Sequence, residues 1–264
     1  MNNFANDDDD DVNAVRSSII EFIKEHRRRP FGVLREVGVQ AALKRFMDIE
    51  LDEYKYVDAK IFNNFNGGYF ENNTVSTDRV RLEARIFRKC MEGVAGKERT
   101  DIIIYNRSNV SIFRHPNGPG DIVYCSNTDS VLAAIEIKAS PSHLLDEKIK
   151  YARDIARLLS LRRHGIAGFF VVLDKSSPLY GEFFKELNVI DWGLDERAEK
   201  PLFDIVMNGN SKNNNKNEWP SILISKNNPG NKIKCIEIWN ASENEAKTDP
   251  KPFYAYYQTQ PEPK

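Results

Sequence analysis

The sequence predicts an α/β protein in which helices flank a mixed central sheet. Two observations lead to this expectation. Short runs of β-branched and apolar residues are separated by longer stretches with helical periodicity, and their order along the chain is helix, three strands, helix, strand. Of the 264 residues, 41% are hydrophobic, which is enough for a sizeable core. We therefore expect one main domain with extensions at both ends.

The first third of the chain is expected to be helical after an unstructured start. Residues 1–13 are polar and acidic and are predicted to form a disordered tail. Apolar residues at helical spacing then predict an N-terminal helix within residues 14–32 and a second helix over residues 33–51. Residues 54–78 are rich in Asn, Gly, Tyr and Phe and are predicted to form an irregular insertion.

Three strands are expected between residues 79 and 139. Residues 79–87 alternate between apolar and charged side chains, which predicts a half-exposed strand. Residues 100–105 and 131–139 are apolar runs of strand length, and the stretch between them, rich in Pro and Gly, is expected to be a loop.

A second helix–strand unit is expected to follow. An apolar stripe predicts a helix over residues 144–163, with Gly165 as its cap and a buried strand over residues 166–173. Residues 175–264 are a C-terminal extension of unknown role. In it we expect a helix near 180–187, an Asn-rich loop over 208–217, strands over 221–225 and 233–239, and then a tail.

Charge and cysteine content set few limits on function. The net charge is −1, from 38 basic and 39 acidic residues, and it would be +4 without the five aspartates Asp7 to Asp11. A nucleic-acid enzyme usually has a more basic footprint. Three widely spaced cysteines offer neither a disulfide framework nor a metal-binding pair. With no secretory signal and no membrane-spanning run, the expected location is the cytoplasm.

The most informative segment for chemistry is Glu136-Ile137-Lys138. Residues two apart on a strand point to the same face, so Glu136 and Lys138 are expected to lie side by side. An acid and an ammonium within an apolar strand cost several kcal/mol unless they are paired or bind a metal. Asp101 opens another apolar strand, and on a neighbouring strand it could bind the same divalent cation as Glu136. A carboxylate pair with a lysine is the set of groups that phosphodiester hydrolysis needs.

Asp101 followed 35 residues later by Glu136-Ile137-Lys138 resembles the signature of the PD-(D/E)XK, or restriction-endonuclease-like, nuclease superfamily. The order of predicted elements over residues 33–174 also resembles the αβββαβ core of that superfamily. Thr100 precedes Asp101 where the signature has Pro.

The resemblance implies a Mg²⁺-dependent phosphodiesterase, for which Mn²⁺ should substitute. Asp101, Glu136 and the backbone carbonyl of Ile137 would bind the metal, and Lys138 would position or activate water. Glu36 in the preceding helix is a further candidate acid. The expected substrate is nucleic acid, DNA ahead of RNA, and the expected type is a restriction, defence or mobile-element endonuclease.

Several simpler interpretations compete with these assignments. Glu36 could be a surface residue that pairs with Arg35 or Lys44, and Glu83 is expected to lie in an exposed ladder of salt bridges away from the site. Solvated side chains are the expected state of two further sets. These are the histidines His115, His143 and His164, and the basic residues Arg27, Arg28, Arg29, Lys148, Lys150, Arg153 and Arg157. Aromatic residues between Phe62 and Phe70 could stack on bases.

Two other functions remain open at this level. The chain could be a catalytically silent nuclease-fold module that binds nucleic acid or a partner protein, or a nuclease subunit that acts only within a complex. A homodimer or a larger complex is compatible with either.

Overall fold

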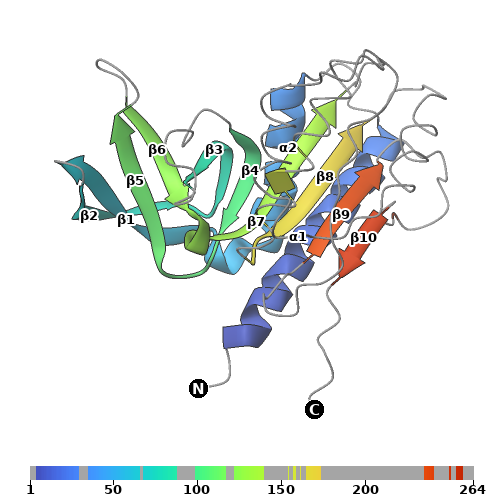
Figure 1. Cartoon of the computed structure of the whole chain (residues 1–264). Coiled ribbons are helices and arrows are strands. Elements are labelled where there is room, and N and C mark those ends of the chain that lie inside the picture. The colour runs from blue at the N-terminus through green and yellow to red at the C-terminus, as the bar shows by residue number, and fades with distance from the viewer. Residues whose placement is uncertain are drawn as a thin grey trace, which may run out of the picture.

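The computed structural model describes residues 4–29, 35–65, 68–87, 99–116, 122–139, 154, 157–158, 161, 165–173, 235–240, 250 and 254–257. One mixed sheet of ten strands forms its centre, in the order β10-β9-β8-β7-β4-β3-β6-β5-β1-β2 (Figure 1). The strands are β1 (Tyr56–Phe65), β2 (Gly68–Asp78), β3 (Val80–Phe87), β4 (Thr100–Tyr105), β5 (Val110–Pro116), β6 (Ile122–Asn127), β7 (Val131–Ala139), β8 (Ala167–Leu173), β9 (Cys235–Asn240) and β10 (Tyr254–Tyr257). This architecture confirms the expected α/β fold with a mixed sheet.

Two helices cover one face of the sheet. Helix α1 (Phe4–Arg28) and helix α2 (Glu36–Glu50) lie behind β7, β8 and β9 in Figure 1, and two short 3-10 turns, η1 (Asp52–Tyr54) and η2 (Thr128–Ser130), join neighbouring elements. Strands β7, β8 and β9 run parallel to one another, whereas β4 is antiparallel to β7. Neither helix has the length and apolarity that crossing a membrane would require, within the residues described.

Helix α1 packs on the sheet because its apolar residues recur at helical spacing. Ile19, Phe22 and Ile23 are fully buried, and they share one core with sheet residues such as Ile135 and Phe169. Burial of each such side chain contributes about 1.5–3 kcal/mol to folding. The core therefore lies between the helices and one face of the sheet. Along β4 and β7, the residues that alternate with these core residues point to the opposite face.

The acidic start of the chain is not a disordered tail. Helix α1 begins at Phe4, and Asp11 is 4% exposed. Asp11 Oδ2 accepts hydrogen bonds from Arg79 Nη2 at 2.5 Å and Arg107 Nε at 2.8 Å. Asp11 stands one turn before Val15, on the buried face of the helix, so its contacts follow from helical spacing. Burial alone would raise the pKa of Asp11, but hydrogen bonds from Arg107 and Arg79 outweigh burial and lower it.

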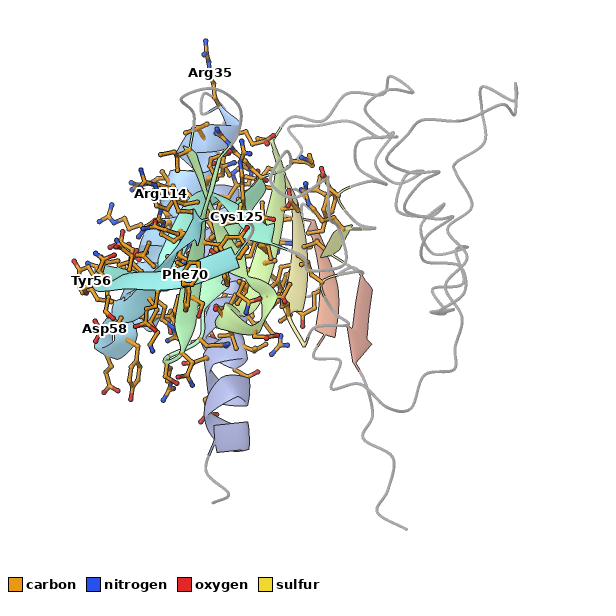
Figure 2. All side chains as sticks on the ribbon, turned by 60° about the vertical axis from the view of Figure 1, so that its left-hand side comes forward. Arg35, Tyr56, Asp58, Phe70, Arg114 and Cys125 are labelled. Carbon is orange, nitrogen blue, oxygen red and sulfur yellow. The ribbon has the colours of Figure 1, made fainter. Side chains whose placement is uncertain are left out.

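The region predicted as an irregular insertion is a long hairpin instead. Strands β1 and β2 pair antiparallel from Tyr56 opposite Asp78 to Phe65 opposite Gly68. Val57 and Ala59 are buried while Asp58 and Lys60 are exposed, so this hairpin has the alternation of a half-buried strand. Figure 2 shows Tyr56 and Asp58 at the outer margin of the sheet and Cys125, which is fully buried, inside it.

Two further strands replace the loop expected before residue 131. Strand β5 pairs with β1 in parallel and with β6 antiparallel, and β6 pairs with β3, so these strands connect the hairpin to the rest of the sheet. Hydrophobic residues Val110 and Ile112 face the interior of this part of the sheet. The strand pairing therefore extends further from the helices than predicted.

The C-terminal part is described only in pieces. The predicted strand within 233–239 is confirmed as β9, and β10 is a strand in the expected tail. Most of the predicted helix over 144–163 lies outside the described residues, including its apolar stripe, while Asp154, Arg157, Leu158 and Leu161 are helical. The helix near 180–187, the Asn-rich loop and the strand over 221–225 also lie outside the described residues. Gly165 has the positive φ of 76° that a glycine helix cap adopts.

Candidate active site

Asp101 and Glu136 lie on neighbouring antiparallel strands, facing the same side of the sheet. Ile102 of β4 pairs with Ile135 of β7, so one further step along each strand brings Asp101 opposite Glu136. Ile102 and Ile135 belong to the core beneath the helices, and the two acids therefore point to the opposite face. Asp101 is 7% exposed and Glu136 is 1% exposed. The predicted adjacency of the two strands is confirmed.

Asp101 is held by the backbone of the strand next to it. Its Oδ2 accepts a hydrogen bond from the Ile137 N–H at 2.6 Å. Burial raises the pKa of Asp101 to about 6, although this hydrogen bond and the charge of Lys138 act in the opposite direction. The carboxyl group is thus poised to change protonation near neutral pH.

Glu136 is fully enclosed and has a cationic neighbour. Arg157 Nη2 contacts Glu136 Oε1, yet Oε1 accepts no hydrogen bond of good geometry from the described residues. Burial raises the pKa of Glu136 well above its usual value, Arg157 opposes the shift, and the charge of Asp101 adds to it. A buried carboxylate with a remaining acceptor site is suited to a further cation.

Lys138 follows two residues after Glu136 and is paired with two acids. Its Nζ lies 2.8 Å from Asp154 Oδ2 and 4.0 Å from Glu36 Oε1. Burial alone would lower the pKa of Lys138, but the charge and hydrogen bond of Asp154 outweigh it and raise the pKa. Lys138 therefore carries its positive charge across the ordinary pH range and acts as a donor and point charge in this state.

Glu36 reaches the site from the first turn of α2. Besides its ion pair with Lys138, its carboxylate accepts a hydrogen bond from the Ala139 N–H. Burial raises the pKa of Glu36 above its usual value, and Lys138 opposes this shift. Arg35 points away from the sheet in Figure 2, and Lys44 pairs with Asp48 at 2.7 Å, so the surface pairing considered for Glu36 is not what the structure has.

Glu83 has an exposed ion pair, as expected, with side chains 38% and 56% exposed for Glu83 and Arg99, but it also lies close enough to Glu36 for its charge to act there, which was not expected. It has a positive φ of 50°, accepts a hydrogen bond from Gln40 Nε2 at 2.9 Å, and lies 3.8 Å from Arg99. Its charge acts on Glu36, which is one helical turn before Gln40. The arginine at the start of the alternating segment, Arg79, is buried against Asp11 instead of lining the surface.

Two site residues were not identified from the sequence as members. Arg157 was expected to be solvated, but its side chain is 12% exposed and lies against Glu136 and Asp154. Asp154, with a side chain 16% exposed, bridges Arg157 at 3.0 Å and Lys138 at 2.8 Å. Their spacing of three residues on a helix was the available signal, because it places an acid and a base on one face.

The remaining candidates add little. His143 and His164, and the basic residues Lys148, Lys150 and Arg153, lie outside the described residues. His115 is on β5, away from Asp101 and Glu136 in the sheet order. Among the residues that the structure describes, no group of three or more His, Cys, Asp or Glu side chains is placed to hold a metal ion.

Comparison with known proteins gives limited information. No protein-family model and no curated protein matches the chain. Two solved structures are similar: Escherichia coli MS115-1 NucC in its cAAA-bound form, and Pseudomonas aeruginosa ATCC27853 NucC in its cAAA-bound form. The first is 16% identical, covers 69% of each chain and has a TM-score of 0.30. The second is 14% identical, covers 61% of this chain and 62% of the other, and has a TM-score of 0.28. A likeness at this level supports no conclusion about fold or function. Conclusions about both therefore rest on the contacts of the residues described above.

Proposed function

We propose that the protein is a metal-dependent nuclease that hydrolyses phosphodiester bonds, with DNA as its substrate ahead of RNA. The observation that supports this most strongly is the placement of Asp101 and Glu136 opposite each other on β4 and β7, with Lys138 on the same face. Two buried acids and an ammonium on one sheet face are costly to fold, and a metal-dependent hydrolytic site gives them a use.

The residues present suit a hard divalent cation. Mg²⁺ and Mn²⁺ prefer oxygen ligands and are commonly bound by one or two carboxylates, with water completing the shell. Asp101 and Glu136 supply two carboxylates, and Glu136 Oε1, which Arg157 contacts, accepts no hydrogen bond of good geometry from the described residues. The carbonyl of Ile137 is proposed as a third ligand. Among the described residues no three acidic side chains are placed to hold one metal ion, so water and substrate oxygens would complete the coordination.

When bound, the cation would supply a water of lowered pKa and offset charge on the phosphate. Lys138, as a partly buried cation beside Glu136, would orient that water or the scissile phosphate. Glu36 holds Lys138 from the side of α2 and is proposed as the additional acid of the site. The assignment to a restriction, defence or mobile-element role rests on the resemblance of the motif to the PD-(D/E)XK superfamily alone.

A catalytically silent module that binds nucleic acid or a partner protein is the second candidate. One observation favours it: Glu136 contacts Arg157 and Lys138 contacts Asp154, so both charges of the motif already have protein partners. A site whose charges balance internally can persist for structural reasons alone. A nuclease subunit that needs a larger complex would show the same pairing.

Incubation of the purified protein with plasmid DNA, single-stranded DNA and RNA decides between these functions. Each substrate is tested with Mg²⁺, Mn²⁺ or excess EDTA. We expect cleavage with either cation, no cleavage with EDTA, and none by Lys138→Ala, whereas Lys60→Ala, at an exposed position of β1, cuts as wild type does. Cleavage that persists in excess chelator refutes the two-carboxylate mechanism. The absence of cleavage of all three substrates favours the silent module.

A further inference from the structure

Four charged side chains alternate in sign around the candidate site. Glu136 contacts Arg157, Arg157 lies 3.0 Å from Asp154, and Asp154 lies 2.8 Å from Lys138. Their side chains are between 2% and 17% exposed. Two of these residues belong to β7 and two to the helical residues after it, so the contacts join the helix to the strand face that bears the motif.

Arg157 lies where a cation is needed to neutralise the negative charge of Glu136. Glu136 faces the like charge of Asp101 from the neighbouring strand, and in the protein alone Arg157 is the largest opposing influence on it. Even with this contact, Glu136 Oε1 accepts no hydrogen bond of good geometry from the part of the chain that the structure describes. A counter-ion that neutralises charge without using the full acceptor capacity can be exchanged for another cation more easily than a fully bonded one.

We propose that Arg157 is a built-in counter-ion that competes with the divalent cation for Glu136, so that cation binding must displace its guanidinium. This inference rests on the proposed metal site at Asp101 and Glu136. Asp154, on the same helix face, accepts a hydrogen bond from Arg157 Nη2 at 3.0 Å and would keep the guanidinium nearby after its displacement. The competition sets the cation concentration at which the site becomes loaded.

The proposal predicts the sign of one affinity change. Isothermal titration of the full chain with Mn²⁺, without nucleic acid and at pH 8.5, is carried out for wild type, Arg157→Gln and Arg157→Lys. A high pH limits competition by protons, because carboxylate ligands must be deprotonated. We expect Arg157→Gln to bind Mn²⁺ at least about tenfold more tightly than wild type, because no guanidinium has to be displaced. A tenfold change in affinity corresponds to about 1.4 kcal/mol of binding free energy. Arg157→Lys keeps the charge and should stay close to wild type.

Controls separate this competition from a supporting role. Arg28→Gln removes an arginine whose side chain is 74% exposed and should leave the Mn²⁺ affinity unchanged. If Arg157 merely orients Glu136 as a ligand, Arg157→Gln binds Mn²⁺ more weakly than wild type, and the proposal is overturned. Unchanged affinity in Arg157→Gln overturns it as well.

A measurement on the wild type covers the case in which Arg157→Gln does not fold. The Nε–Hε resonance of Arg157 is assigned by its absence from the spectrum of Arg157→Lys, and Mg²⁺ is then added to the wild-type protein. We expect this resonance to shift as Glu136 is taken over by the cation, and an unmoved resonance at saturating Mg²⁺ refutes displacement.

The outcome can be separated from that of the proposed function. Tighter Mn²⁺ binding by Arg157→Gln without cleavage of any nucleic acid supports the competition and rejects the nuclease. Equal cation affinity in wild type and Asp101→Ala rejects the metal site, and the competition with it.

Discussion

The buried carboxyl group of Asp101 makes a quantitative prediction about stability without metal. Asp101→Asn replaces it with a neutral side chain of nearly the same shape, whose oxygen can still accept the hydrogen bond from the Ile137 N–H. The folded-state pKa of Asp101 is raised, so the wild-type group stabilises the fold only while it is protonated. That contribution is complete below pH 3.8 and is lost as the pH rises through about 6.

The size of the effect follows from the pKa. Asp101 changes from 3.8 in the unfolded chain to about 6 in the fold, and each pKa unit corresponds to about 1.4 kcal/mol. Ionised Asp101 thus costs the metal-free fold about 3 kcal/mol at pH 8, but only about 0.5 kcal/mol at pH 4. Asp101→Asn should therefore be more stable than wild type at pH 8 and should lose most of this advantage at pH 4.

Urea unfolding in the presence of EDTA at pH 4, 6 and 8 measures the difference. Asp58→Asn is the matched control, because Asp58 is exposed on β1, and its substitution should change the free energy of unfolding by less than about 0.5 kcal/mol at each pH. Two results would refute the burial of an ionisable group here. Either Asp101→Asn is no more stable than wild type at pH 8, or its stability advantage over wild type is as large at pH 4 as at pH 8. Addition of Mn²⁺ should reverse the order by stabilising wild type alone.

Three further outcomes are expected. Asp11→Asn leaves Arg79 buried without its counter-ion and should lower the free energy of unfolding by about 3–5 kcal/mol in urea titrations; a loss below about 1 kcal/mol contradicts the role of this contact. Phe22→Ala opens a cavity under the sheet and should lower the free energy of unfolding by about 3–5 kcal/mol in the same titrations. A loss as small as that of a surface substitution would disprove the core position of Phe22. Lys138→Ala should lose turnover while keeping Mg²⁺ affinity within a few-fold in calorimetry, whereas Asp101→Ala should lose both; equal Mg²⁺ affinity in wild type and Asp101→Ala disproves its assignment as a ligand.

The parts of the fold with a strong local signal were predictable. Residues 100–105, 131–139 and 166–173 are dense apolar runs of strand length, and β4, β7 and β8 are found there. Glu136 and Lys138 stood out for the same reason, since charges inside such a run are unusual. Predicting that Asp101 lies beside Glu136 required only one correct strand pairing, that of β4 with β7.

The hairpin was missed although the sequence between its two strands carries a local signal. Asn66-Gly67 stands between Phe65 and Gly68, which are paired residues, and this dipeptide favours a two-residue hairpin turn. The many asparagines around it lowered the apparent strand propensity of the segment. Tertiary pairing of β1 with β5 compensates for that weak propensity.

Charged residues that pair over long sequence distances were not predictable. Asp11 and Arg79 are 68 positions apart, and nothing near either residue distinguishes it from a solvated charge. Arg157 likewise belongs to a basic helix face, and only the position of β7 shows that it lies against Glu136. Such contacts depend on which elements become neighbours, which local patterns do not encode.

The position of α1 has a consequence for how the chain folds during its synthesis. The helix is made before the strands that cover its apolar face, and Arg16 bonds Glu237 at 2.7 Å across 221 positions. Until those strands emerge from the ribosome, the apolar face of α1 can pack only on α2, as Phe22 does against Phe46. Contacts of such long range also slow folding, because the intervening chain must first close into a loop. The nascent protein therefore cannot complete this core until β9 emerges, because Trp239 of that strand belongs to the same core as the apolar face of α1.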